Sequence, residues 1–254
     1  MNKLRIIARL DIKNEHVIKG IHLEGLRKVG NPNEMAKRYY DAGADEIVFM
    51  DAVAAYYDRN SLSDIIEQAC EDIFIPITVG GGIRTIEDIQ TALNSGADKV
   101  AINTKAIAEP DFIKKAAKIF GSQCIVLSIV AKNIAPQKWE AYTDNGREPT
   151  GVDVLEWVKK VEKLGAGEIM LTSIDKEGTK KGFDIDLNSA VSKVTNLPII
   201  SSGGAGSSQD VVELCNSSNI DAVALASILH YNISNISEIK QTLVDNGIKV
   251  RLDA

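Results

Sequence analysis

The sequence predicts an α/β protein with a (β/α)8 TIM barrel built from two repeated half-barrels. Residues 43–47 return as residues 165–169, and the glycine run of 79–82 returns at 201–204, both 122 residues further along. Eight short runs rich in Ile and Val alternate with longer amphipathic stretches, which is typical of βα units around a parallel sheet. Eight such units favour a closed barrel over an open doubly wound sheet, whose usual G-x-G-x-x-G segment is also missing.

Each element follows from the hydrophobic pattern of the chain. Strands are expected near residues 4–11, 46–51, 75–79, 98–103, 124–130, 167–173, 198–202 and 221–225. Helices are expected near residues 32–43, 61–71, 86–96, 110–120, 152–164, 186–195, 208–217 and 236–246, several of them opened by a capping Asn, Ser, Thr or Asp. A length of 254 residues suits one barrel, so we expect a single domain over 1–254 with halves of about 1–122 and 123–254.

Composition narrows the range of partners and compartments. The 29 basic and 35 acidic residues give a net charge of −6 with interspersed signs, so no basic stripe is available for nucleic acid. Basic residues interrupt the apolar run of residues 1–10, which predicts neither a signal peptide nor a membrane span and favours a cytoplasmic protein. The cysteines and histidines lack ligand spacing, so we expect no metal and reduced, mostly buried thiols; these residues are Cys70, Cys124, Cys215, His16, His22 and His230.

Two connections are long for a compact domain. Residues 12–31 and 131–150 both follow strands, which places them at the catalytic end of a barrel. The sequence Asp-Asn-Gly at 144–146 predicts a hairpin turn in the second connection. We expect both connections to serve the site, and the alternative is that they are surface insertions.

Polar and glycine residues gather where the predicted strands end. Glycine pairs let the backbone approach an anion closely, and polar residues at the next strand end add donors. A first phosphate site is expected at Gly81, Gly82, Asn103 and Thr104. The repeat predicts a second at Gly203, Gly204, Ala226 and Ser227, supported by Glu177 and Gly178. The ligand would then carry phosphates at both ends, although glycine in a βα turn is sometimes needed for geometry alone.

The chain resembles the cyclase subunit of imidazole glycerol phosphate synthase, a two-fold repeated barrel of the histidine pathway. The resemblance extends from end to end. It is carried by residues 5–7, 10–11, 17–20, 43–46, 78–84, 121–126, 165–169, 171–175 and 202–204. The run at 78–84 recurs in related phosphate-binding barrels, but its combination with 165–175 is specific to this family.

The resemblance implies a reaction and a set of roles. Ammonia made by a separate glutaminase subunit would pass through the barrel to a bisphosphorylated ribulosyl nucleotide. The products would be imidazole glycerol phosphate and aminoimidazole carboxamide ribonucleotide, with no cofactor or metal. Asp11 occupies the family's general-base position, whereas Val130 occupies its general-acid position and carries no acid. Substrate binding is also expected at Lys19, Asp51, Thr172 and Ser202.

The resemblance also implies a gate at the opposite end of the barrel. The family closes this floor with two basic and two acidic residues, which here are Arg5, Glu46, Lys99 and Glu168. Opposite charges at four strand starts can satisfy one another in an ammonia gate. The alternative is a purely structural ion network. Asp98 and Gln123 stand at positions where the family docks its glutaminase, so a heterodimer is expected.

Arg9 is a second departure from the family, which usually has a small residue there. Side chains alternate along a strand, so Arg9 would point into the barrel about 6.6 Å deeper than Asp11. A buried guanidinium must be paired, and Asp11 and Asp51 are its expected partners. Pairing would lower the pKa of Asp11 and narrow the ammonia path. Alternatively, Arg9 turns aside to a local carboxylate and leaves the path open.

Three functions are compatible with these residues. The first is the cyclase, with Asp11 acting together with a water, Lys19 or another group as acid. The second is a paralogue that delivers ammonia to another acceptor, such as an amidino-modified sugar of a bacterial surface. The third is a non-catalytic activator of a glutaminase. Val130, Arg9 and the unusual loop at 54–57 favour the second.

Overall fold

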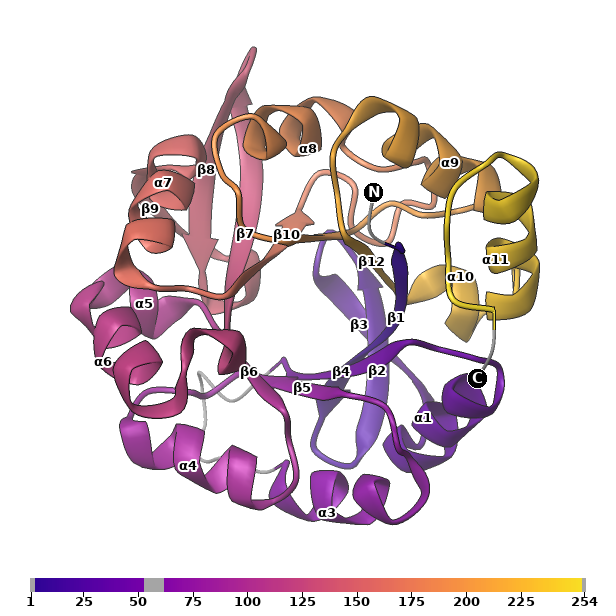
Figure 1. The fold of residues 1–254 in the computed structure, drawn as a ribbon, viewed down its shortest axis with the longest axis horizontal. Coiled ribbons are helices and arrows are strands. Elements are labelled where there is room, and N and C mark those ends of the chain that lie inside the picture. Colours follow the sequence, from indigo (N-terminus) through magenta and orange to yellow (C-terminus); the bar gives the residue numbers. More distant parts are fainter. Residues whose placement is uncertain (1–2, 53–61, 253–254) are drawn as a thin grey trace.

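The computed structural model describes residues 3–52 and 62–252, and it forms a closed barrel of eight parallel strands (Figure 1). The strands follow one another around the ring in chain order, and the last strand pairs with the first. They are β1 (Arg5–Lys13), β4 (Glu46–Asp51), β5 (Ile77–Gly80), β6 (Lys99–Ile102), β7 (Ile125–Ala135), β10 (Glu168–Ser173), β11 (Ile199–Ser202) and β12 (Ala222–Leu225). This confirms the predicted (β/α)8 fold. The loop at 54–57 lies outside the described residues.

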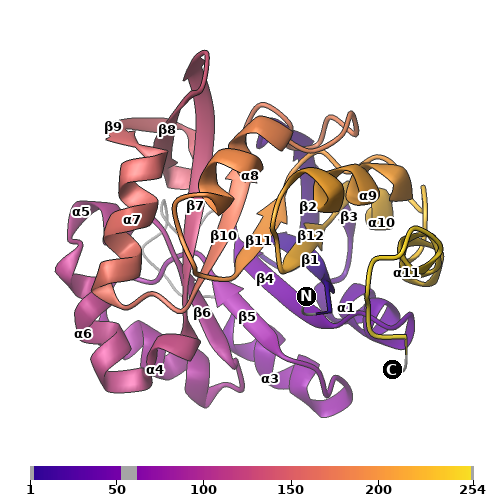
Figure 2. The same cartoon turned by 45° about the horizontal axis from the view of Figure 1, so that its top comes forward.

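Helices surround the strands as an outer ring (Figures 1 and 2). They are α1 (Pro32–Asp41), α3 (Ser63–Asp72), α4 (Ile86–Asn94), α5 (Thr104–Ala108), α6 (Asp111–Phe120), α7 (Val154–Leu164), α8 (Ile185–Ser192), α9 (Ser208–Ser217), α10 (Ser227–His230) and α11 (Ile236–Asp245). Polar N-caps start most of them, and Thr85 and Ser207 form matching capping boxes 122 residues apart. The described residues contain no helix long and apolar enough to span a membrane.

The two long connections fold as antiparallel hairpins on top of the barrel. β2 (His16–Ile21) and β3 (Glu24–Gly30) extend from β1, while β8 (Lys138–Thr143) and β9 (Glu148–Asp153) extend from β7. The predicted turn at Asp144–Gly146 joins β8 to β9, and its three residues have positive φ angles of 48°, 55° and 82°. Both hairpins leave the first strand of their half, so they extend the repeat into the loops.

Two apolar layers follow from the alternation of side chains along the strands. The larger layer packs between the strands and the helices. The smaller one fills the inside of the barrel and consists of Ile7, Val48, Ala101, Val126, Met170, Ile200, Ala222 and Ala224. This inner layer separates charged residues at the strand starts from polar residues at the strand ends.

Candidate functional site

The first glycine pair lines a cavity of about 360 Å³ at the strand ends of β5 and β6. Gly81 and Gly82 have φ angles of 89° and 72°, and a Cβ on Gly81 would lie 2.2 Å from the backbone oxygen of Asp51. Only glycine fits this turn. Asn103 and Thr104 line the same cavity, as predicted, and the Asn103 amide donates to the Tyr142 carbonyl at 2.9 Å. The second hairpin is thereby fixed beside the pocket.

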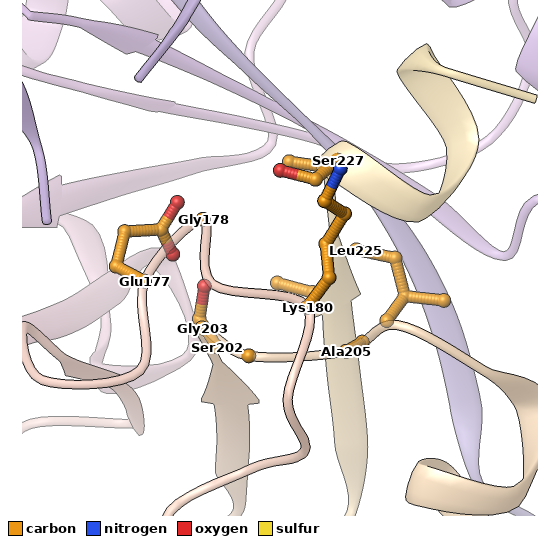
Figure 3. A pocket seen from close by; sticks show the side chains of 11 residues that line it. Glu177, Gly178, Lys180, Ser202, Gly203, Ala205, Leu225 and Ser227 are labelled. Carbon is orange, nitrogen blue, oxygen red and sulfur yellow. The ribbon is translucent and has the colours of Figure 1, made fainter. Parts of the chain in front are cut away.

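The second glycine pair forms a smaller pocket (Figure 3). It lies at β11 and β12, which the strand order places across the barrel from β5 and β6. Gly203 and Gly204 have φ angles of 95° and 111°, and the pocket is completed by Glu177, Gly178, Ser202, Ala226 and Ser227. A Cβ on Gly178 would lie 2.2 Å from the Gly20 carbonyl oxygen, so the first hairpin approaches this pocket closely. The structure therefore brings each predicted set of phosphate residues together.

The repeat is preserved in the backbone of the two pockets. Asn103 has φ −127° and ψ −84°, and its counterpart Ala226 has φ −130° and ψ −81°. This conformation lies outside the regular helical and extended regions. Because two unlike side chains adopt it, the conformation reflects the shape of the pocket rather than the preference of either residue.

Four charged side chains form a buried chain between the pockets. Arg9 Nε donates to Asp11 at 2.9 Å, Lys19 Nζ donates to the other Asp11 oxygen at 3.3 Å, and Lys19 also pairs with Glu177. Burial disfavours the charged form of Asp11, but Arg9 and Lys19 outweigh it and lower the pKa of Asp11 to about 2. The expected effect of Arg9 on Asp11 is therefore confirmed. Asp11 is ionised at neutral pH and is a weak base.

Arg9 also reaches across the interior of the barrel. Its Nη1 donates to Thr172 Oγ1 at 2.9 Å and to Ser202 Oγ at 3.1 Å, on strands that are not neighbours of β1. Arg9 lies above the inner apolar layer and is 4% exposed. The structure does not show the expected ion pair between Arg9 and Asp51, and the guanidinium bonds to Asp11 and to the two hydroxyl groups instead. The side chain pairs locally and also narrows the interior.

Val130 lies in the middle of β7, beside Thr172 of β10 and Tyr142 of β8, at the position where the family pattern has an acid. It packs against Leu23 and Ile174, with Tyr142 beside them. The first hairpin supplies Leu23, and the second supplies Tyr142. This edge of the site is therefore an apolar wall, while the charged chain of Asp11 forms another edge.

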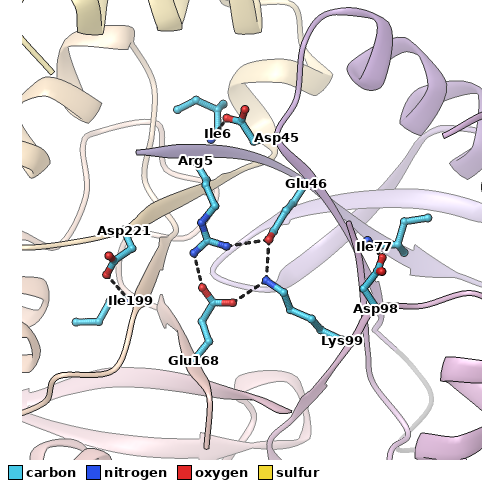
Figure 4. Close-up of polar contacts among 10 residues, drawn as sticks. All are labelled: Arg5, Ile6, Asp45, Glu46, Ile77, Asp98, Lys99, Glu168, Ile199 and Asp221. Atoms are coloured by element: carbon cyan, nitrogen blue, oxygen red, sulfur yellow. Dashed lines mark hydrogen bonds and ion pairs between the residues drawn. The ribbon is translucent and has the colours of Figure 1, made fainter. Parts of the chain in front are cut away.

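The charged residues at the barrel floor form a closed ring (Figure 4). Arg5 pairs with Glu46 at 2.8 Å and with Glu168, and Lys99 Nζ lies 2.7 Å from Glu46 and 3.0 Å from Glu168. Each charge has two partners of the opposite sign, as predicted. Asp98 accepts a hydrogen bond from the Ile77 backbone at 2.8 Å, so its carboxylate also supports the start of β5.

The chain is similar to known proteins along most of its length. The model for "Histidine biosynthesis protein" matches residues 5–235. The chain belongs to this family. A "subunit HisF" of imidazole glycerol phosphate synthase from Legionella pneumophila is 58% identical over 206 residues, covering 81% of this chain and 97% of the relative. The proteins of the same name from Lactococcus lactis subsp. cremoris and Streptococcus sanguinis are 48% and 47% identical over 249 and 252 residues, covering 98% and 99% of this chain and 96% and 100% of their own lengths.

The resemblance inferred from the sequence is thus confirmed, and the structure adds residues that the sequence reasoning missed. Arg84 and Lys105 line the first pocket, and Lys180 lines the second. In Figure 3 the Lys180 side chain extends toward Ser227. Nearby basic residues in a glycine-rich loop are the signal that could have suggested them. In this member of the histidine biosynthesis family, a lysine therefore accompanies each glycine pair, and an arginine also accompanies the first.

The expectation about the cysteines is wrong in part. Cys70, Cys124 and Cys215 are free, but all three are only partly buried. They lie on or beside the outer helices, where packing covers one side of each residue. Burial still raises the pKa of Cys70, and it raises that of Cys215 to about 11. Neither thiol is suited to nucleophilic chemistry at neutral pH.

Proposed function

We propose that this chain is the cyclase subunit of a glutamine amidotransferase complex and acts in imidazole glycerol phosphate synthesis. The relatives bear the name of that synthase over nearly their full lengths. The observation that carries the proposal is the pair of repeat-related glycine pockets on opposite sides of one barrel mouth. One ligand with a phosphate at each end fits this spacing of sites.

In the proposed reaction, ammonia and a bisphosphorylated ribulosyl nucleotide yield imidazole glycerol phosphate and aminoimidazole carboxamide ribonucleotide. The first pocket would hold one phosphate through Gly81, Gly82 and Thr104. The second would hold the other through Gly203 and Ser227. Glycine turns with φ near 90° bring backbone N–H groups within reach of phosphate oxygens, and the lining lysines and arginine supply charge.

Ammonia would enter through the floor ring. The four paired charges of Arg5, Glu46, Lys99 and Glu168 close the interior from below, and the inner layer above them is apolar. Neutral ammonia crosses an apolar lining more readily than ammonium, since burying an isolated charge is costly. The floor is also the proposed docking face for a glutaminase, with Asp98 and Gln123 beside the ring.

The test is direct. Purified chain is given the bisphosphorylated nucleotide with an ammonium salt at alkaline pH, and consumption of the nucleotide is followed. We expect turnover that Asp11→Asn abolishes, because Asn accepts no proton and leaves Arg9 and Lys19 without their shared partner. Absence of turnover in the unsubstituted chain, with the nucleotide bound, would reject this function.

A second function is favoured by two residues at the reacting centre. Arg9 crosses the interior and Val130 lacks an acid, so the site departs from the paired carboxylates of the family pattern. A paralogue that delivers ammonia to another acceptor, such as an amidino-modified surface sugar, would keep the floor and the pockets. Binding of the bisphosphorylated nucleotide without turnover, together with retained stimulation of a glutaminase, would point to this function or to a non-catalytic activator.

A further inference from the structure

The Arg9 guanidinium is held at two of its nitrogens and uncommitted at the third. Asp11 holds Nε, while Thr172 and Ser202 hold Nη1. Within residues 3–52 and 62–252, Nη2 donates to no protein group. Three hydrogen bonds on Nε and Nη1 therefore fix the plane of the guanidinium and leave its second terminal N–H pair available.

Arg9 faces the space where a ligand would lie. It lines the 360 Å³ cavity together with Ser128, Asn103 and Val130, beside the first glycine pair. The cavity lies between that pair and the charged chain of Asp11. A molecule spanning the two phosphate pockets would thus pass the guanidinium with its middle part rather than with its ends.

Val130 completes this arrangement because it offers no counter-charge. A carboxylate at position 130 would line the same cavity as Arg9 and pair with its remaining N–H groups. Valine instead packs on Leu23 and Ile174 and keeps that side of the cavity apolar. A permanent cation beside an apolar wall, away from bulk water, interacts strongly with any negative charge that develops nearby.

We propose that Arg9 is a catalytic residue whose Nη2 stabilises the oxyanion formed when ammonia adds to a carbonyl carbon of the acceptor. This inference rests on the proposed use of ammonia. A C–N bond forms and the C=O π pair moves onto oxygen beside Nη2. The nitrogen loses one proton, and the same proton passes to the oxygen to give the neutral carbinolamine. Ammonia and the carbonyl are the only reactants, and no net acid or base is consumed.

The proposal explains how the site works without an acid at position 130. Electrostatic stabilisation by a fixed donor replaces proton donation, and removal of one such donor commonly costs about 100-fold to 1,000-fold in rate. The alternative role for Arg9 is that of a stopper, a side chain that obstructs the ammonia path. Removal of the guanidinium should raise kcat if Arg9 obstructs the path and lower kcat if it stabilises the oxyanion.

The experiment measures kcat and kcat/KM for the acceptor from pH 7 to pH 9.5 at constant free ammonia. Arg9→Met is expected to lower kcat by about 100-fold or more at every pH, and Arg9→Lys to recover only part, because it lacks the planar fork. Lys159→Met, on the outer helix α7, is the control, since it also replaces a cation by methionine but lies away from the site. Its kcat should stay unchanged. An unchanged or faster Arg9→Met would overturn the proposal in favour of a stopper.

A second pair of variants distinguishes stabilisation of the oxyanion by Arg9 from proton donation by an acid at position 130. Val130→Asp alone is expected to slow the enzyme, because the new carboxylate pairs with Nη2. Val130→Asp combined with Arg9→Met is expected to be faster than Arg9→Met alone and to lose activity at alkaline pH, as a carboxylic acid ionises. A gain of rate in the Val130→Asp single variant would contradict the proposal, because it would show that the missing acid limits the chain.

A binding measurement decides the availability of Nη2 independently of turnover. Acetate is titrated into the full chain while the guanidinium N–H resonances of Arg9, assigned by their loss in Arg9→Lys, are followed by NMR. We expect acetate to shift them in the unsubstituted chain and not in Val130→Asp. No shift in the unsubstituted chain would overturn the inference whatever the reaction. A shift without any ammonia-dependent turnover would instead reject the proposed function and the catalytic role with it.

Discussion

A buried histidine makes the stability of this chain depend on pH. His230 follows the second phosphate pocket on α10, and it stacks on Tyr39 with 5.8 Å between ring centroids. Its Nδ1 lies 2.7 Å from the Tyr39 hydroxyl, and its Nε2 is buried without a partner among the described residues. Burial, reinforced by the Lys19 and Arg38 charges and opposed by Asp11, lowers the pKa of His230 from 6.5 to about 4.

The sign and size of the effect follow from linkage. The unfolded chain takes up a proton near pH 6.5, whereas the folded chain does so only near pH 4. Stability is therefore lost as the pH falls through this window. The difference between the two pKa values lowers the free energy of unfolding by about 3 kcal/mol below pH 4. Between pH 7 and pH 5 the loss is about 2 kcal/mol. Asp11, with its pKa near 2, changes the free energy of unfolding by less than about 0.1 kcal/mol between pH 7 and pH 5, because its stabilising effect is lost only at lower pH.

The assay is urea unfolding at pH 7, 6 and 5 under constant ionic strength. The unsubstituted chain should lose about 2 kcal/mol over this range. His230→Phe keeps a ring against Tyr39 but cannot titrate. Its free energy of unfolding should therefore lack the loss of about 2 kcal/mol between pH 7 and pH 5. His16→Gln, on the first hairpin, is the matched control and should keep the full dependence. An equal pH dependence in His230→Phe and in the unsubstituted chain would refute the reasoning.

Three further predictions test other parts of the structure. Gly81→Ala should destabilise the chain by at least about 2 kcal/mol more than Gly25→Ala in urea unfolding, because both glycines have positive φ but only Gly81 would meet backbone, at 2.2 Å. Lys99→Met leaves the two floor glutamates with one cation, so it should cost about 2 kcal/mol and change glutamine-driven turnover more than ammonium-driven turnover. Cys215 should react with iodoacetamide more slowly than free cysteine at pH 8, measured by mass spectrometry, since burial raises its pKa to about 11.

Most of the fold could be predicted from the sequence because each barrel strand is marked by a local apolar pattern. Apolar runs located the eight strands, and caps such as Thr85 and Ser207 located helix starts that the structure confirms. The short helices α5 and α10 were not predicted, because they have too few residues to show a helical period. The first hairpin was not predicted either, since its strand β3 is mostly exposed and lacks an apolar run.

The candidate site was predictable where the repeat marked it and unpredictable where distant residues meet. The glycine pairs were visible because the chain contains them twice. Nothing near Arg9 in the sequence indicated that its guanidinium ends on Thr172 and Ser202, which are more than 160 residues away along the chain. Such a contact depends on barrel closure and on the length of the side chain, so only the assembled interior shows it.

The most direct test of the account is a tracer experiment on the unsubstituted chain. The bisphosphorylated ribulosyl nucleotide is incubated with 15N-labelled ammonium at alkaline pH, and the products are analysed by mass spectrometry. We predict one 15N atom in the imidazole ring of imidazole glycerol phosphate, incorporated about 100-fold or more slowly by Arg9→Met and not at all by Asp11→Asn. Unlabelled nucleotide recovered intact from the unsubstituted chain would contradict it.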